Sequence, residues 1–140
     1  MSRKAPKNRF AIYATLLVVF AFAVAIAHDA TVGWKYQKEA RAAQLTGGSA
    51  ARGADAIARY GCASCHIIPG IAHPSDSRVG PQLDDVGQRT YVGGVVLNKP
   101  ENLVRWIMDP KAIDPHTAMP NMGVTEDDAR DIATYLYSQR

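Results

Sequence analysis

The chain of 140 residues has a mass of 15.2 kDa, which leaves room for one small domain, and only two of its residues are cysteines. Its formal charge of +3 is unevenly distributed, because the part from Gly53 onward carries eight Lys or Arg against eleven Asp or Glu, a formal charge of −3. The basic excess therefore belongs to the N-terminal part, and the composition gives no reason to expect nucleic-acid binding.

The N-terminal segment is basic and then strongly apolar. Four Lys or Arg and no acidic residue lie in positions 1–9, and eighteen uncharged residues follow at positions 10–27. As a helix this run covers about 27 Å, close to the thickness of the bilayer hydrocarbon core. The apolar character continues toward Trp34, whose ring suits the membrane interface. We therefore predict a cytoplasmic tail over residues 1–9 and a transmembrane anchor in the lipid bilayer over residues 10–34.

A cleaved signal peptide is the alternative, since Ala25-Ile26-Ala27 matches an A-x-A cleavage site after a basic start. The apolar run is longer than the about 7 to 15 residues usual in signal peptides, which favours a retained anchor. The positive-inside rule then places the N-terminus in the cytoplasm and everything after Trp34 outside. For a Gram-negative bacterium this predicts a single-pass protein of the inner membrane with a periplasmic domain.

Residues 35–52 are expected to form a stalk that carries a domain of residues 53–140. Helix-forming residues in the stalk let the membrane helix continue outward until Thr46-Gly47-Gly48 interrupts it. The glycines are expected to leave the domain free to pivot.

Short helices separated by proline and glycine are predicted for the domain, which indicates an all-α fold. The first covers residues 50–60 with Ser49 as its N-cap, the second covers residues 100–109, and the third begins at Thr125. Only residues 91–97 have the composition of a strand. Because three short helices with long loops at 67–89 and 111–124 bury little apolar surface, we expect a bulky bound group to complete the core.

The sequence Cys62-Ala63-Ser64-Cys65-His66 contains both cysteines of the chain in a C-x-x-C-H pattern. In this pattern the two thiols add to the vinyl groups of a haem, and the adjacent histidine ligates its iron. The pattern therefore predicts one haem c, covalently held through two thioether bonds by Cys62 and Cys65, with His66 as a metal ligand.

Other interpretations of the motif are weaker. A disulfide between Cys62 and Cys65 would close a very short loop and stabilise little. A thioredoxin-type redox pair lacks the βαβ pattern and leaves His66 unexplained. A zinc site needs a fourth ligand, and the other histidines are scattered at positions 28, 73 and 116. Chance placement does not explain why an exported domain has no other cysteine.

The second axial position of the iron has three candidate ligands in one loop. Met119 and Met122 offer thioethers, and His116 offers an imidazole. The residue types alone leave all three open.

From about Gly53 to its end, the chain resembles the small single-haem class I cytochromes c. The shared motifs are C-x-x-C-H at 62–66, G-P-x-L at 80–83, an arginine at 89, D-P at 109–110, P-x-T-x-M at 115–119 and D-[LI]-x-x-Y-L at 131–136. The resemblance implies the class I cytochrome c fold of short helices around one covalent haem, here preceded by a single N-terminal transmembrane helix.

The resemblance also implies roles for the matching positions. Met119 would be the distal iron ligand, and Pro81 would accept a hydrogen bond from the ring of His66 through its backbone carbonyl. Gly53 would let the first helix of the domain lie close to the last. The other implied cofactor contacts are Leu83 and Trp106, which would pack on the haem, and Arg89 and Thr117, which would approach its propionates.

Two departures from the mitochondrial-type members concern the surroundings of the haem. The segment between Arg89 and Leu103 is shorter, so the additional propionate donors of that region have no counterpart, and Tyr91 is the expected substitute. The ring of lysines used for docking is absent, which argues against long-range steering toward an acidic partner.

With His66 and Met119 both on the iron, no position is open to a substrate, so the resemblance implies an electron carrier and not an enzyme. An anchored carrier meets partners in the same bilayer at high effective concentration. The expected donor is a quinol-oxidising bc complex, and the expected acceptor is a haem-copper terminal oxidase. The alternatives are a fixed cytochrome c subunit of a respiratory or photosynthetic complex, and a gas-binding haem protein, which needs a vacant or labile sixth position.

Overall fold

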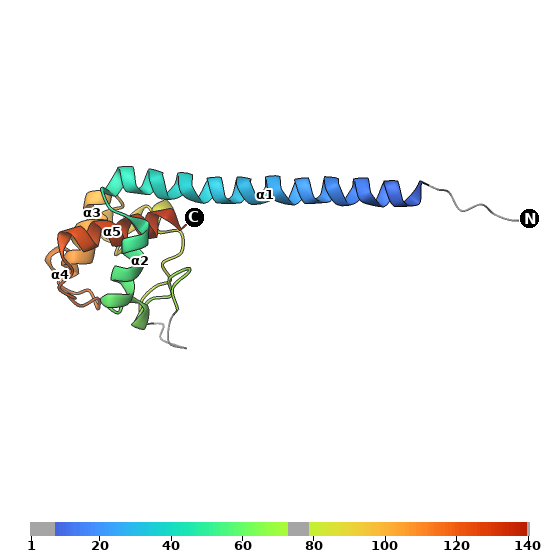
Figure 1. The fold of residues 1–140 in the computed structure, drawn as a ribbon. Coiled ribbons are helices and arrows are strands. Elements are labelled where there is room, and N and C mark those ends of the chain that lie inside the picture. Colours follow the sequence, from blue (N-terminus) through green and yellow to red (C-terminus); the bar gives the residue numbers. More distant parts are fainter. Residues whose placement is uncertain (1–7, 73–78, 140) are drawn as a thin grey trace, which may run out of the picture. The chain divides into compact units, whose positions relative to one another are not determined.

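The computed structural model describes residues 8–72 and 79–139, and it divides into two compact units, Met1–Lys35 and Tyr36–Arg140. A single helix, α1 (Arg9–Thr46), continues across the boundary between the units (Figure 1). Its unbroken length agrees with the prediction that the membrane helix extends outward as far as Thr46.

The first unit contains the apolar part of α1. Its large apolar side chains at positions 10–26 are each at least 51% exposed. The most apolar window of 18 residues has a mean hydropathy of 2.6, and among the described residues α1 is the one helix long and apolar enough to cross a membrane. Signal sequences share this property. Apolar side chains without protein neighbours are stable in hydrocarbon, so this part of α1 has the character of a membrane span.

The second unit begins with the last turns of α1, which contact the C-terminal helix α5 (Glu126–Ser138). Thr46 is buried, its hydroxyl shares a hydrogen bond with that of Thr134, and its carbonyl accepts a hydrogen bond of 3.1 Å from Arg130. A Cβ at Gly48 would lie 2.5 Å from the carbonyl carbon of Arg130. The chain after α1 is therefore held against α5, and the expectation of a free pivot at these glycines is wrong.

Helix α2 (Ala50–Arg59) makes the most extensive helix contact of the second unit, with α5 (Figure 1). A Cβ at Gly53 would lie 2.1 Å from the carbonyl oxygen of Asp131 and 2.9 Å from Cβ of Tyr135. Only glycine allows the two backbones to approach this closely. The predicted close approach at Gly53 is confirmed.

The buried carboxylate of Asp131 on α5 also holds α2 and α5 together. The carboxylate accepts hydrogen bonds from the N–H of Ser49 at 2.6 Å and from the guanidinium of Arg52 at 2.7 and 2.8 Å. These contacts raise the pKa of Arg52 through the hydrogen bond and the opposite charge. Ser49 caps α2 as predicted, by accepting the Arg52 N–H at 3.5 Å. One carboxylate of α5 thus fixes the start of α2.

Two consecutive helices follow in the middle of the domain, α3 (Pro100–Met108) and α4 (Pro110–Ile113). The first ends one residue earlier than predicted because Asp109 is not helical (φ −147°, ψ 84°) and instead caps α4, accepting the N–H of Ala112 at 3.2 Å. Helix α4 lies in a stretch that was predicted to be a loop, because a single helical turn shows no hydrophobic periodicity.

The predicted strand is a two-stranded hairpin, in which β1 (Tyr91–Val92) pairs antiparallel with β2 (Val96–Leu97). Gly93 and Gly94 have φ values of 58° and 77°, and the Val95 N–H bonds to the Val92 carbonyl. Two consecutive positive φ values are what a type I′ turn requires. The glycines of the apolar stretch therefore turn the chain back on itself.

The hydrophobic core of the second unit lies among α2, α3 and α5. Helix α5 follows Thr125, which caps it by accepting the Asp128 N–H at 3.3 Å. The buried apolar residues of the three helices are Ala50, Ala56, Ile57, Leu103, Val104, Trp106, Ile107, Ala129, Ile132, Ala133, Tyr135 and Leu136. The three helices predicted from periodicity thus supply most of the core.

Tyr137 on α5 takes part in a network of hydrogen bonds beside this core. Its hydroxyl donates to the side-chain oxygen of Asn98 at 2.7 Å, and the Asn98 amide donates to the carbonyls of Val86 and Arg89 at 2.6 and 2.9 Å. Burial raises the pKa of Tyr137 to about 12, and Glu101 adds to the rise. The network joins α5 to the 3-10 turn η2 (Val86–Gln88) and the hairpin.

Replacing Gly53 with valine should lower the free energy of unfolding by about 3 kcal/mol or more, because the new side chain overlaps the backbone of α5. Ala58→Val is the control, since Ala58 is exposed on the same helix. Thermal unfolding of the full chain in detergent, followed by circular dichroism, measures both effects. An unchanged melting temperature for Gly53→Val would contradict the close crossing.

The variant Tyr137→Phe should be less stable than the wild type by about 1 kcal/mol at neutral pH, because it loses the hydrogen bond to Asn98. Folding raises the pKa of this hydroxyl from 10.0 to about 12, so the stability it contributes is present below pH 10 and is lost as the pH rises toward 12. Urea unfolding across this range should show the advantage of the wild type shrinking. A constant difference would contradict the burial of the hydroxyl.

Candidate haem-binding site

Helix α2 leads directly into the C-x-x-C-H motif. After the helix ends, Gly61 takes a left-handed conformation (φ 67°) and begins the 3-10 turn η1 (Cys62–Ser64). The N–H groups of Cys65 and His66 bond to the carbonyl of Cys62 at 3.3 and 3.0 Å. The motif is thus a compact turn, and both of its thiols are free and half-buried.

Asp128 on α5 fixes the end of α2 just before this turn. Its carboxylate accepts hydrogen bonds from the Tyr60 hydroxyl at 2.8 Å, the Arg59 guanidinium at 2.6 Å and the Thr125 hydroxyl at 3.1 Å. These hydrogen bonds hold the pKa of Asp128 below its ordinary value, and the bond from Tyr60 has the largest effect, ahead of those from Arg59 and Thr125. Since Asp131 fixes the start of α2, the helix is tied to α5 at both ends.

The imidazole of His66 is held at one of its two nitrogens. Nδ1 lies 2.7 Å from the carbonyl oxygen of Pro81, so the contact that the resemblance implied is present. Because a carbonyl can only accept, Nδ1 carries a proton in this contact, and in the neutral imidazole Nε2 is then the nitrogen with the lone pair. This hydrogen bond fixes the orientation of the ring and leaves Nε2 available as a metal ligand.

Gly80 packs against the same imidazole. A Cβ at Gly80 would lie 2.4 Å from Cε1 and 2.5 Å from Nδ1 of His66. Backbone hydrogen bonds hold the two segments together, from Gly80 to the Cys65 carbonyl at 2.9 Å and from Leu83 to the Ile67 carbonyl at 2.8 Å. The G-P-x-L motif was recognised in the sequence, but the steric reason for its glycine was missed, because the contact joins segments that are distant in the sequence.

Of the three ligands considered for the second axial position, Met119 is the one that packs against the core, and it is half-buried. Met122 is 46% exposed, and the imidazole of His116 is 96% exposed beside Asp114. The Thr117 hydroxyl accepts the N–H of Met119 at 3.3 Å and so orders the loop. The position of Met119 is consistent with its predicted role as a ligand, which stays a prediction.

Cys62, Leu83 and Met119 pack against one common core, of which Trp106 is a member. Trp106 is 9% exposed, and a Cβ at Gly93 would lie 2.3 Å from its indole ring. The hairpin turn thus covers the tryptophan. The four predicted cofactor contacts Cys62, Leu83, Trp106 and Met119 come from four separate segments, and all of them belong to or pack against the hydrophobic core of the second unit.

Arg89 has a structural role that the sequence did not reveal. Its guanidinium donates to the carbonyl of Gln82 and, at 3.0 Å, to that of Asp84. These bonds brace the loop that contains Pro81 and Leu83.

The other predicted propionate contacts have different surroundings. Tyr91 is 52% exposed on β1, and Thr117 is half-buried in the Met119 loop. The approach of Arg89, Tyr91 and Thr117 to haem propionates stays a prediction.

The residues fit a covalently bound haem. Both thiols are free, Nε2 of His66 is available, and the thioether of Met119 lies against the apolar cluster. Burial raises the pKa of the Cys62 thiol, and the nearby Cys65 adds to the rise. A thiol with a raised pKa is a poor redox nucleophile at neutral pH, which argues against a thioredoxin-type pair.

The zinc interpretation finds no support in the described structure. Across residues 8–72 and 79–139, no group of three or more His, Cys, Asp or Glu side chains is placed to hold a metal ion. His73, one of the histidines considered, lies outside the described residues.

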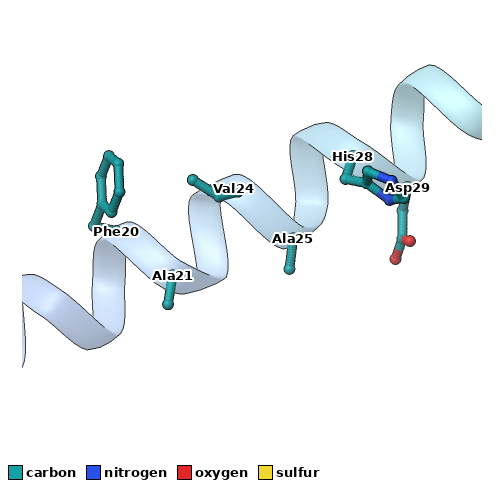
Figure 2. Close-up of a pocket in the computed structure, with 6 residues that line it drawn as sticks. All are labelled: Phe20, Ala21, Val24, Ala25, His28 and Asp29. Carbon is teal, nitrogen blue, oxygen red and sulfur yellow. The ribbon is translucent and has the colours of Figure 1, made fainter.

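A shallow apolar groove on α1 is separate from this site. Figure 2 shows that every residue lining it belongs to this one helix: Phe20, Ala21, Val24, Ala25, His28 and Asp29. Among residues 8–72 and 79–139, no second element lines the groove, and none of the predicted site residues does so.

Comparison with known proteins links the second unit to one family. The family model described as cytochrome c matches residues 50–140. No solved structure gives a significant match to the chain.

Three curated relatives are named cytochrome c oxidase subunit 2. The protein of Bacillus sp. (strain PS3) is 31% identical over 91 residues, which cover 63% of this chain and 26% of the relative. The Alkalihalophilus pseudofirmus protein is 27% identical over 116 residues, covering 82% of this chain and 33% of the relative. The Bacillus subtilis protein is 28% identical over 106 residues, covering 75% and 30%. The chain thus spans between a quarter and a third of the length of these relatives.

Gly80→Ala should lower the stability of the haem-loaded chain by about 1 to 3 kcal/mol and reduce the proportion of chain that carries haem, because the added methyl group displaces the His66 ring. Pro81→Ala is the matched control, since it keeps the carbonyl that accepts from Nδ1. Haem absorbance per mole of purified chain measures the loading. Equal loading of Gly80→Ala and the wild type would show that the ring has room to move.

Met119→Leu removes the thioether while nearly conserving apolar volume. The reduced variant should bind carbon monoxide, because one axial position becomes vacant, whereas Met122→Leu should not. Absorption spectra of the reduced proteins before and after exposure to the gas measure this. Binding by Met122→Leu but not by Met119→Leu would reassign the ligand.

Proposed function

Because the chain belongs to the cytochrome c family, we propose that it transfers single electrons in a respiratory chain, through one haem c carried outside a bacterial inner membrane. The match to residues 50–140 includes all of the predicted haem domain, residues 53–140. Electron transfer follows from the family, and the residue roles, topology and partners below are parts of the proposal.

In this proposal Cys62 and Cys65 would hold haem c through two thioether bonds, and Nε2 of His66 and the sulfur of Met119 would ligate its iron. When bound, haem c supplies one-electron redox chemistry. The observation that carries the assignment is the 2.7 Å contact between His66 and Pro81, because it occupies Nδ1 and leaves Nε2 as the ring nitrogen that can ligate iron, in a motif with two free thiols. If both side chains ligate the iron, they would leave no position on it for a substrate.

The surrounding residues would orient the ligands and exclude water. Gly80 and Pro81 hold the His66 ring, while Leu83 and Trp106 contribute apolar surface. A thioether ligand and an apolar environment both favour the reduced state, so we expect a potential well above that of a bis-histidine haem. Propionate contacts are assigned to Arg89, Tyr91 and Thr117.

Residues 10–34 would anchor the chain in the bilayer, with the N-terminus in the cytoplasm and the haem domain in the periplasm. The support is the exposed apolar surface of α1 together with the basic residues that precede it. A cleaved signal peptide is the competing interpretation of the same segment.

The relatives named as cytochrome c oxidase subunits favour a respiratory partner. We propose that the chain accepts electrons from a quinol-oxidising bc complex and passes them to a haem-copper oxidase. Because the relatives are themselves oxidase subunits by name, a fixed cytochrome c subunit of such a complex is the second candidate.

Native electrophoresis of gently solubilised membranes with haem staining, followed by intact mass measurement of the stained species, tests this function. An uncleaved chain with one haem in a small species supports the anchored carrier, and the same mass within a large assembly supports the fixed subunit. A chain that begins near His28 in the soluble fraction would refute the anchor. The absence of covalent haem would refute the function itself.

A further inference from the structure

Tyr135 on α5 contacts the chain on both sides of the C-x-x-C-H motif. Before the motif, Cβ of Tyr135 lies against Gly53 of α2, where an added Cβ would come within 2.9 Å of it. After the motif, the hydroxyl of Tyr135 donates a hydrogen bond of 2.6 Å to the carbonyl of Pro69. The side chain is buried. One tyrosine thus joins the two segments that flank the motif.

The loop after the motif packs against this hydroxyl. Gly70 has a φ of 76°, and a Cβ there would lie 2.8 Å from the hydroxyl oxygen of Tyr135. Ile68 is buried in the core, and its carbonyl accepts the N–H of Ile71 at 3.1 Å. Burial raises the pKa of the Tyr135 hydroxyl, so the group stays a donor at neutral pH. The loop is therefore held by its own turn, by the core and by this hydroxyl.

Three hydrogen bonds connect the motif and the start of this loop to residues 80–83. They join the Gly80 N–H to the Cys65 carbonyl at 2.9 Å, the Leu83 N–H to the Ile67 carbonyl at 2.8 Å, and Nδ1 of His66 to the Pro81 carbonyl at 2.7 Å. Only two residues separate His66 from Pro69, whose carbonyl Tyr135 holds. Because so short a stretch of chain has little slack, movement of Pro69 would shift the backbone that carries the imidazole.

We propose that Tyr135 is a positioning residue for His66: its hydroxyl keeps the imidazole against the Pro81 carbonyl and thereby lowers the redox potential of the bound haem. The inference rests on the proposed function, because it concerns the haem that His66 would ligate. A hydrogen bond donated by Nδ1 makes the imidazole a stronger metal ligand, and a stronger ligand favours ferric iron. Weakening this hydrogen bond therefore raises the potential.

The sign of the change separates positioning from a general loosening of the domain. A domain that merely loosens admits water to the site, and loss of the apolar environment favours the charged ferric state. The potential then falls. Loss of a positioning contact at His66 raises it instead.

The variant Tyr135→Phe tests the proposal, because it keeps the ring and removes only the hydroxyl. Its midpoint potential, measured by redox titration of the haem-loaded full chain in detergent, should rise above that of the wild type. Ser138→Ala is the matched control, because it also removes a buried hydroxyl from α5. The hydrogen bond of this hydroxyl, 2.7 Å to the carbonyl of Tyr135, stays within the helix. The potential of Ser138→Ala should equal that of the wild type.

Exchange of the Nδ1 proton of His66 with deuterium is the second measurement, followed by proton NMR of the reduced, haem-loaded chain. This proton should exchange about tenfold faster in Tyr135→Phe than in the wild type, because the ring leaves the Pro81 carbonyl more often. Ser138→Ala should exchange it at the wild-type rate.

A lower or unchanged potential in Tyr135→Phe would overturn the proposal, as would an equal rise in Ser138→Ala or an unchanged rate of proton exchange. Failure of Tyr135→Phe to incorporate haem would assign the hydroxyl to folding and would overturn it as well. None of these outcomes touches the proposed function, which is refuted instead by the absence of covalent haem in the wild-type chain.

Discussion

The close crossing of α2 and α5 is the contact on which the rest of the haem domain depends. Gly53 brings the two backbones together, and Asp131 and Asp128 tie the start and the end of α2 to the same helix. Because only Tyr60 and Gly61 separate the end of α2 from the C-x-x-C-H motif, the crossing also decides where both thiols and His66 lie. The contacts of one glycine and two carboxylates with α5 thus determine where the cofactor-binding motif lies.

The site is preorganised mainly by backbone contacts. The Pro81 carbonyl orients His66, the Gly80 backbone lies against its ring, and Arg89 binds the carbonyls of the loop that carries both. A ligand held in this way needs little reorganisation when the charge of the iron changes, which suits electron transfer. Cys62, Leu83 and Met119 are partly buried apolar residues that pack against the core, and a haem bound by the motif would be expected to cover apolar surface of this kind.

The junction between the membrane helix and the domain is an ordered part of the domain. Thr46 is buried against Thr134, and Gly48 lies against the backbone of Arg130. The last turns of α1 are therefore held by the same helix, α5, that positions the haem motif.

Local signals in the sequence determined much of this protein. Periodicity and capping predicted both ends of α2 and α3 and the start of α5 to within one residue, and the C-x-x-C-H motif indicated the cofactor, because both signals depend on residues that are neighbours in the chain. The missed features are of two kinds. The four-residue helix α4 is too short to show a hydrophobic period. The other missed features arise only when folding brings distant segments together: the packing of Gly48 on α5, the contact of Gly80 with His66, and the hydrogen bonds from Arg89 to its loop. The sequence by itself determined the cofactor-binding motif and therefore the kind of chemistry expected of the chain. The tertiary structure decided which residues hold the predicted ligands in place, because steric fit depends on distances between segments that are far apart in the sequence.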